Sequence, residues 1–312
     1  MPSRRDVLRL SSALAILPLG PLGAATQVAG VYRRSVGEAT VTCLLDGWLG
    51  LDPAMLNGVD AAEAEALLAE SFRAAGPVPT SINAFVVETP DRTVAIDSGG
   101  GPHFIDTGGN HARLLEVAGI DPAAVDTVFA THLHPDHIGG LADDFGDPLF
   151  PEATLVLHEA DHAFWTDDAN FADAPDMAKA FAQGAQRAVG LYDGALELVG
   201  DGHALTPELT VMHLPGHTPG HSGLMLSSGD ESLLLWADIV HMGAVQFARP
   251  EVTIPFDVDP EQAAATRARA LDMAATDRLE VAGAHVGFPG LGHVARAGSG
   301  YRLRPSHWEY AL

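Results

Sequence analysis

The sequence predicts a layered α/β domain, and three observations support this fold class. First, the chain has 312 residues, of which 47% are hydrophobic, which is enough for a large core and excludes a disordered chain. Second, short apolar runs bounded by Gly, Pro and Asp recur along the chain, as strands do. Third, helical patterns lie between these runs, and no linker, charge block or repeat interrupts residues 26–312.

The apolar runs have the length and the β-branched content of strands. In chain order they are Val41–Leu45, Ala84–Val87, Val94–Ile96, Val128–Ala130, Leu155–Leu157, Leu209–Met212, Leu224–Leu226 and Leu233–Ala237. Two helices are also indicated. Over Asp60–Ala75, apolar residues, Phe72 among them, recur at close to 3.6-residue spacing. At Asp259, a capping aspartate is followed by proline, which predicts a helix that continues to about Ala275.

Residues 1–25 have the pattern of an export signal. Arg4 and Arg5 precede an apolar run, Leu10–Leu19, and small residues follow at Gly23–Ala25. This order is typical of a twin-arginine signal peptide, although an amphipathic helix would also fit it. We expect cleavage near Ala25, a mature domain over residues 26–312, and a periplasmic or otherwise exported location.

The charge and the cysteine content exclude several kinds of partner. The chain carries 41 acidic and 17 basic residues, a formal net charge of −24. Such a charge repels nucleic acid and anionic lipids, and no apolar run reaches the roughly 18 residues that insertion into a membrane requires. Cys43 is the only cysteine, which excludes an intramolecular disulfide, and we expect it to be a buried apolar residue. The expected partner is therefore a small molecule.

A dense group of histidines marks the candidate site. His132, His134, Asp136 and His137 directly follow an apolar run. Burial of three imidazoles and a carboxylate is costly without a partner, and a divalent cation is their usual partner. In an extended segment His132 and His134 point to the same side and can share one metal ion. The next residue is a proline that turns the chain, so that Asp136 and His137 can reach a second ion.

Further candidate ligands follow later apolar runs. His217 lies in a turn rich in Pro and Gly, Asp238 follows Leu233–Ala237, and His285 follows another apolar segment. Side chains delivered at successive strand ends converge on one edge of a sheet, where α/β enzymes place their sites. His221, in the same turn as His217, is expected to hydrogen-bond a ligand, with an ordinary loop residue as the alternative.

The remaining histidines receive no ligand role. His213 is expected at the end of a strand, and His293 either orients His285 or packs in the core. The others are taken as ordinary surface or core residues: His103, His111, His158, His162, His203, His241 and His307. The run Gly99–Gly101 is interpreted as a loop near the site, because no Lys-Ser/Thr follows it as in a phosphate-binding loop.

The segment His132-Leu133-His134-Pro135-Asp136-His137, followed by His217, Asp238 and His285, resembles the metallo-β-lactamase-fold hydrolases over about residues 80–290. Within that family the similarity is greatest to methyl parathion hydrolase and its lactonase relatives. It is carried by Asp97–Phe104, Thr131–Leu141, Phe164-Trp165, Gly216–His221, Ala244–Phe247 and Gly290–Tyr301.

The resemblance implies a four-layer αββα sandwich and two divalent metal ions, Zn²⁺ by default, bridged by a hydroxide. One ion would be held by His132, His134 and His217. The other would be held by Asp136, His137 and His285, and Asp238 would bridge both.

The family chemistry implied is hydrolysis, because two close divalent ions make hydroxide available at neutral pH. Asp136 would also take the proton or pass it to the leaving group. Phe104 and Trp165 match aromatic positions that line the substrate pocket of the relatives, with ordinary core packing as the alternative for each. Family members commonly dimerise, so a homodimer is compatible with the resemblance.

Several substrate classes share this ligand set. A hydrolase of lactones or aryl esters, with side activity on organophosphate triesters, fits best. A β-lactamase is disfavoured because those enzymes generally lack a bridging aspartate such as Asp238, and a nuclease is disfavoured by the charge. A glyoxalase II-type thioesterase should carry a basic patch near its C-terminus, for which Arg302 and Arg304 are the only hint. A non-enzymatic periplasmic metal-binding protein would need a broken ligand set.

Overall fold

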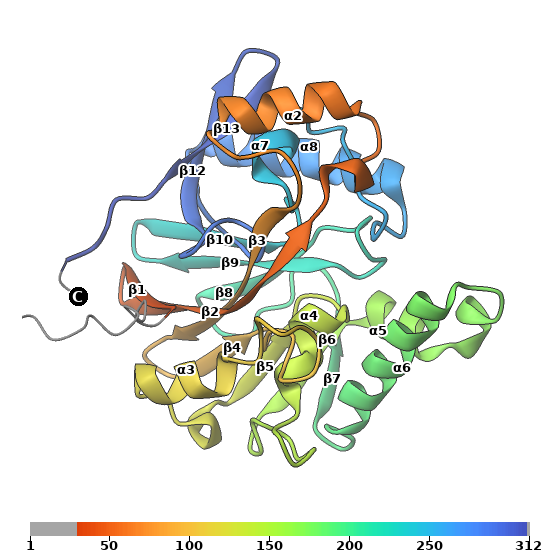
Figure 1. The fold of residues 1–312 in the computed structure, drawn as a ribbon. Coiled ribbons are helices and arrows are strands. Elements are labelled where there is room, and N and C mark those ends of the chain that lie inside the picture. Colours follow the sequence, from red (N-terminus) through yellow and green to blue (C-terminus); the bar gives the residue numbers. More distant parts are fainter. Residues whose placement is uncertain (1–29, 311–312) are drawn as a thin grey trace, which may run out of the picture.

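Two β-sheets face each other in the computed structural model, which describes residues 30–310, and helices cover their outer faces (Figure 1). This is the four-layer αββα arrangement, so the expected fold class is confirmed. The signal expected over residues 1–25 lies outside the described residues. No helix within residues 30–310 is long and apolar enough to cross a membrane.

The first sheet has seven strands in chain order, β1 to β7. Its strands are β1 (Val31–Val36), β2 (Ala39–Leu51), β3 (Val78–Glu88), β4 (Thr93–Ile96), β5 (Thr127–Ala130), β6 (Thr154–His158) and β7 (Leu196–Val199). Neighbours from β1 to β4 are antiparallel, whereas β4 to β7 are parallel. The parallel half places the carboxyl ends of β4, β5 and β6 at one edge.

The second sheet has six strands in the order β13-β12-β11-β10-β9-β8. Its strands are β8 (Leu209–His213), β9 (Ser222–Ser228), β10 (Glu231–Ala237), β11 (Glu280–Gly283), β12 (Leu291–Ala297) and β13 (Gly300–Pro305). All neighbours are antiparallel except β10 and β11. The carboxyl ends of β10 and β11 therefore also lie side by side.

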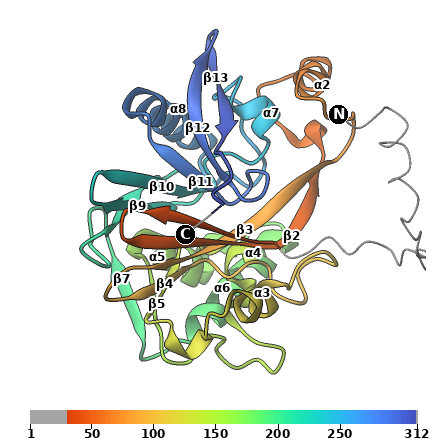
Figure 2. The ribbon, with the colours of Figure 1, turned by 90° about the vertical axis from the view of Figure 1, so that its left-hand side faces the viewer.

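The helices form the two outer layers. On the first sheet lie α3 (His111–Ala118), α4 (Pro135–Ile138), α5 (Glu159–Thr166) and α6 (Asp176–Gly190). On the second lies α8 (Pro260–Asp277), and both ribbon views place α2 (Ala61–Glu70), α7 (Gly243–Gln246) and the β12–β13 hairpin at the same end (Figures 1 and 2). Short 3₁₀ turns cover Pro53–Met55, Pro122–Ala124, Gly139–Leu141 and Asp168–Phe171.

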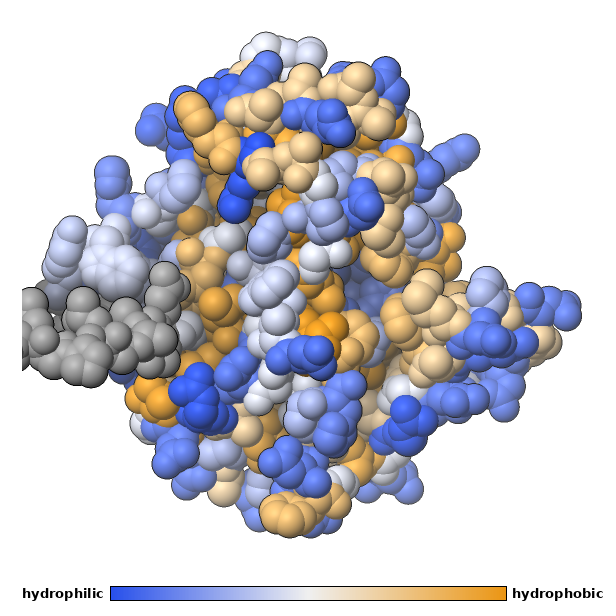
Figure 3. Space-filling model, viewed as in Figure 1, coloured by the Kyte–Doolittle hydropathy of each residue, from blue (hydrophilic) through white to orange (hydrophobic). Residues whose placement is uncertain are grey.

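Apolar side chains fill the space between the layers. One cluster lies between the two sheets and includes Cys43, which is fully buried as expected. A second cluster packs α3, α5 and α6 on the first sheet, and a third packs α8 on the second. On the face drawn in Figure 3, hydrophilic and hydrophobic side chains are interspersed. The core thus holds the two sheets rigidly against each other, and the loops at their shared edge carry the polar residues.

The two helices predicted from sequence form, and one of them is shorter than expected. Asp259 caps α8 by accepting the backbone N–H of Gln262, and the helix reaches Asp277. The helix expected over Asp60–Ala75 ends at Glu70 instead. Phe72 takes a left-handed backbone conformation (φ 56°) that breaks the helix, and its ring is 98% exposed rather than on the buried face.

Candidate metal centre

The histidine motif lies where the first sheet ends. After β5, residues 131–134 lead to α4, which begins at Pro135, and His134 precedes its first turn in an extended conformation. Proline suits this first helical position because it has no N–H to satisfy. His132 Nε2 and His134 Nδ1 lie 3.0 Å apart, so the two rings share one side of the chain as the alternation predicts.

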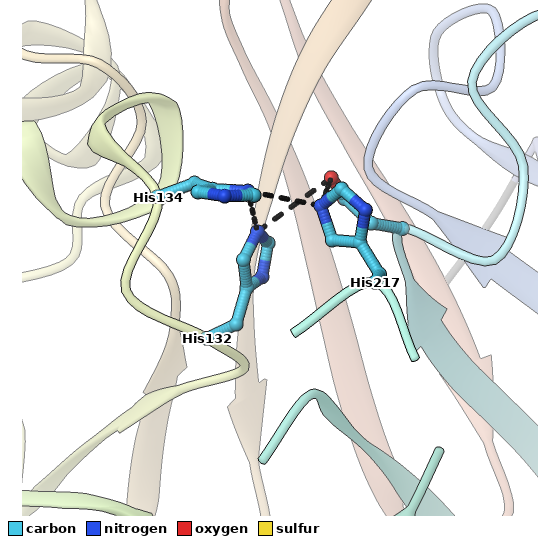
Figure 4. Close-up of side chains that lie close together, drawn as sticks. His132, His134 and His217 are labelled. Atoms are coloured by element: carbon cyan, nitrogen blue, oxygen red, sulfur yellow. Dashed lines mark hydrogen bonds and ion pairs between the residues drawn. The ribbon is translucent and has the colours of Figure 1, made fainter. Parts of the chain in front are cut away.

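A third imidazole reaches this pair from the second sheet. His217, in the loop after β8, places Nε2 2.9 Å from His134 Nδ1. Figure 4 shows the three rings turned toward a common point, two from the motif loop and one from across the gap between the sheets. All three side chains are buried.

Asp238 follows β10 and lies at the centre of the cluster, where its side chain is 2% exposed. Its carboxylate oxygens lie 3.2 Å from His137 Nε2, His217 Nε2 and His285 Nε2, and 3.7 Å from His132 Nε2. Asp136 Oδ2 lies 3.4 Å from His285 Nε2 and 3.7 Å from His137 Nε2. The structure thus brings all seven expected ligand residues together.

The seven residues separate into the two groups that the resemblance assigns. One group consists of His132, His134, His217 and Asp238, and the other consists of Asp136, His137 and His285. Within each group the nearest donor atoms all lie within 4.8 Å of one another. Each group therefore has the compactness that one divalent ion needs.

Partners outside the cluster hold the rings by their other nitrogens. Asp97 Oδ2 accepts from His137 Nδ1 at 2.7 Å, Asp257 Oδ1 accepts from His217 Nδ1 at 2.8 Å, and the Ser81 carbonyl accepts from His285 Nδ1 at 2.8 Å. Such hydrogen bonds leave Nε2 of each ring directed inward, free to bind a metal ion. Asp97 and Asp257 are functional residues that sequence reasoning did not assign. For Asp97, its place directly after the strand β4 was the available signal.

Asp161 joins the two loops that carry histidines. This buried carboxylate on α5 accepts the N–H of Leu133 at 2.9 Å and the N–H of Gly220 at 2.8 Å. Burial raises its pKa, while these hydrogen bonds act against that rise. Because one bond reaches each loop, Asp161 fixes the distance between the motif and His217.

The glycine run does form a loop near the site. Gly99 has φ +74°, and a Cβ on Gly101 would lie 2.3 Å from the carbonyl oxygen of Gly139, beside the motif helix. Asp46 supports the same loop by accepting the N–H groups of Gly100, Gly109 and His111. The glycines therefore allow close packing of this loop on the motif.

The other histidines fall into clear places. His221 donates from Nδ1 to the Leu214 carbonyl, and its Nε2 accepts the N–H of Asp238 at 3.1 Å, so it orients the central aspartate. His213 ends β8 as expected, and its ring stacks on that of His158 at 4.1 Å. His293 neither orients His285 nor packs in the core, because it is exposed on β12 and faces the Leu279 carbonyl.

His241 was expected to be an ordinary surface or core residue, but it lies in the ligand cluster. It is 5% exposed, its Nε2 lies 3.0 Å from Asp238 Oδ2, and its ring stacks on that of His285 at 5.0 Å. With Asp238 and His285 it forms a third compact group of donor atoms. No sequence signal marked it, because it lies three residues beyond Asp238 in a loop without a motif.

The two aromatic residues expected in the substrate pocket lie differently. Trp165, on α5, is 3% exposed and packs in the core, which is the alternative given for it; its ring stacks on that of Phe171 at 5.4 Å and meets the His134 ring edge-on at 5.3 Å. Trp165 therefore packs against the ring of His134. Phe104 is half-buried, next to Gly100 in the glycine loop.

The electrostatics of the cluster are dominated by Asp238. Burial alone would raise its pKa, but the surrounding imidazoles, His137 and His285 first, hold it well below its usual range. Burial lowers the pKa of His217, but hydrogen bonds to Asp238 and Asp257 outweigh this and raise it to about 9. Burial and neighbouring imidazoles lower the pKa of His132 well below its usual value. The cluster thus gathers imidazoles with raised and with lowered pKa values around one carboxylate.

These residues fit a pair of divalent cations. His137 Nε2 and Asp238 Oδ1 are buried 3.2 Å apart, and within residues 30–310 neither atom makes a hydrogen bond. Imidazole nitrogens also approach one another to 2.9–3.0 Å around His134. Such inward-facing donor atoms are costly to bury alone, and nitrogen and carboxylate donors are the ligands that Zn²⁺ and similar ions take.

A model of the metallo-beta-lactamase superfamily matches residues 77–285, which include the whole cluster. The chain belongs to this superfamily. In this chain the two sheets match the fold of the superfamily. The two groups of His and Asp side chains indicate divalent metal ions as cofactors.

Members of the superfamily with solved structures cover nearly the whole chain. The hydrolase AbOPH, described as a member of the beta lactamase superfamily, is 32% identical with a TM-score of 0.86, over 91% of this chain and 100% of that one. AidC, a dizinc quorum-quenching lactonase solved with a product, is 25% identical with a TM-score of 0.84, over the same shares. Among curated superfamily proteins, the acyl-coenzyme A thioesterase MBLAC2 of Bos taurus is 30% identical over 176 residues, 52% of this chain. The chain spans 60% of the length of that thioesterase.

Proposed function

We propose that this chain is a binuclear metal-dependent hydrolase of lactones or aryl esters. The observation that carries the proposal is the convergence of seven buried His and Asp side chains into two compact donor groups. Asp238 lies next to histidines of both groups. The likeness to AidC, a lactonase, supports the substrate class. The likeness to AbOPH supports hydrolysis in general, and we include weaker turnover of organophosphate triesters in the proposal.

In this proposal His132, His134 and His217 hold one Zn²⁺, Asp136, His137 and His285 hold the other, and Asp238 contacts both. When bound, the two ions supply an acidified water as nucleophile and a Lewis acid for the substrate oxygen that gains charge. The buried rings of His137 and His217 are held by Asp97 and Asp257, so they do not have to move as the reaction proceeds. The water oxygen bonds to the acyl carbon, the C–O bond to the leaving group breaks, and the leaving oxygen takes up the proton.

Asp136 is the residue best placed to move that proton. Its side chain is 12% exposed, against 2% for Asp238 and 2% for His285. It therefore reaches the solvent side of the cluster while its Oδ2 stays 3.4 Å from His285 Nε2. A carboxylate in this position can come within hydrogen-bond reach of a substrate that enters from the solvent side, as proton transfer requires.

A substrate panel tests the proposal directly. Purified protein with measured metal content is given lactones, aryl esters, phosphotriesters, β-lactams and acyl thioesters. We expect lactones or aryl esters to have the highest kcat/KM, phosphotriesters to react more slowly, and chelation to abolish all turnover. Thioesters are the second candidate, because MBLAC2 is a thioesterase. Efficient β-lactam turnover without lactone or ester hydrolysis would overturn the proposal.

Metal binding should depend on pH in a defined direction. Three imidazoles have raised pKa values in the metal-free protein: His217, at about 9, His137 and His285. A metal ion must displace their protons, so its apparent affinity should increase as pH rises from 7 toward 9, with protons released. Calorimetric Zn²⁺ titrations at pH 7 in two buffers of different ionisation enthalpy measure the release. An affinity that falls over this range would contradict the assignment of these rings as ligands.

Export belongs to the same proposal. The twin-arginine pattern of residues 1–25 supports a periplasmic enzyme that folds before export.

A further inference from the structure

A cleft of about 680 Å³ opens beside the metal-ligand cluster. His241 and His285 line one part of it, and both rings contact Asp238. Its other walls come from α2, α7 and the β12–β13 hairpin, which lie at one end of the molecule in both ribbon views (Figures 1 and 2). A substrate whose reacting bond lies at the cluster therefore has room to extend into this cleft.

The cleft gathers arginines although the chain as a whole is acidic. Its charged side chains, apart from the histidines, are Glu70, Arg73, Arg249 and Arg302. The sequence as a whole carries 41 acidic and 17 basic residues. Because Arg249 has acidic partners of its own, Arg73 and Arg302 are the positive charges that remain available in the cleft, and a cleft wall focuses the field of such charges.

Two of the three arginines have no competing acidic partner. Arg249 pairs with Glu63 and Glu251. Arg73 and Arg302, in contrast, make no ion pair within residues 30–310, and both are exposed to the solvent that fills the cleft. Guanidinium groups present paired donors that match the oxygens of a carboxylate or a phosphate.

We propose that the cleft between α2 and β13 binds an anionic oxygen group, a carboxylate or a phosphate, at the far end of the ester or lactone substrate. This inference rests on the proposed hydrolase function and narrows it. Arg73 and Arg302 contact the anion, and the reacting carbonyl lies at the His241 and His285 end.

The experiment compares two substrates that differ in the charge at one end. One is the mono-4-nitrophenyl ester of terephthalate, whose free carboxylate cannot reach its own ester group, and the other is its methyl ester. Wild-type enzyme should prefer the charged ester, and 0.5 M NaCl should remove most of this preference by screening. Arg73→Gln and Arg302→Gln should each raise KM for the charged ester about three- to fivefold, as exposed ion pairs allow. Neither should change the kinetics of the methyl ester.

Arg304→Gln is the matched control, because Arg304 is exposed on the same strand, two residues from Arg302, and does not line the cleft. It should behave as wild type with both esters. Equal kinetics of the two esters in wild type, or an equal KM increase in all three variants, would overturn the inference.

A binding measurement separates this inference from the proposed function. Calorimetry with succinate and with 3-phosphonopropionate shows which anion the cleft prefers and needs no turnover. Binding to wild type that is lost in the Arg73→Gln/Arg302→Gln double variant supports the cleft even if neither ester is hydrolysed, a result that would refute only the hydrolase proposal. No difference between wild type and the double variant refutes the cleft.

Discussion

Asp238→Asn should bind at most one metal ion per chain at Zn²⁺ concentrations that fill both sites of the wild type. The asparagine keeps the shape of the side chain and removes the negative charge that four ligand nitrogens approach within 3.2–3.7 Å. Two cations would then face each other without a shared anion. Activity should fall by more than the roughly 10–100-fold loss expected when a ligand loses only its hydrogen-bond partner. Elemental analysis and kcat/KM measure the two effects.

Asp257→Asn provides the comparison for that variant. Asp257 contacts His217 at Nδ1, and the inward Nε2 of that ring keeps its place beside Asp238. We expect two metal ions at saturation, weaker affinity, and a loss of activity within the 10–100-fold range. If Asp238→Asn bound two ions with wild-type affinity, the assignment of Asp238 as the shared ligand would be wrong.

Trp165→Ala should lower the free energy of unfolding by about 3–5 kcal/mol, the usual cost of removing a large buried aromatic side chain. The ring is 3% exposed and contacts Phe164, Phe171 and His134. Because it supports His134 rather than the substrate, kcat/KM should fall by a similar factor for aromatic and aliphatic substrates. Urea denaturation of the metal-free protein measures the stability change, and the substrate panel measures the selectivity.

Trp48→Ala is the control for this prediction, since Trp48 is 49% exposed on β2. Its change in unfolding free energy should stay within about 0.5 kcal/mol. Trp165→Phe should recover most of the stability because it keeps an aromatic ring against Phe171. A selective loss of aromatic substrates, with normal stability in Trp165→Ala, would restore the substrate-pocket role.

The sequence alone was sufficient for the layered fold and for the seven candidate ligands. Both depend on local patterns: apolar runs of strand length, and His or Asp placed directly after them. His132 and His134 are two residues apart on an extended segment, so their common side follows from backbone geometry. Helix α6 was not among the predicted helices, although it is amphipathic, with a buried face that is mostly alanine, at 182, 185 and 188.

Only the tertiary structure decided which residues orient the ligands and what surrounds the site. Asp97 reaches His137 across 40 positions, Asp257 reaches His217 across 40, and Asp161 holds Gly220 across 59. Trp165 packs in the core with residues far from it in the sequence, and Arg73 and Arg302 line one cleft although they are distant in the sequence. Periodicity describes neighbours along one element, whereas these contacts depend on how two sheets and their loops pack together. The sequence thus determined the chemistry available to this protein, and the packing of its layers determined how that chemistry is held and what can approach it.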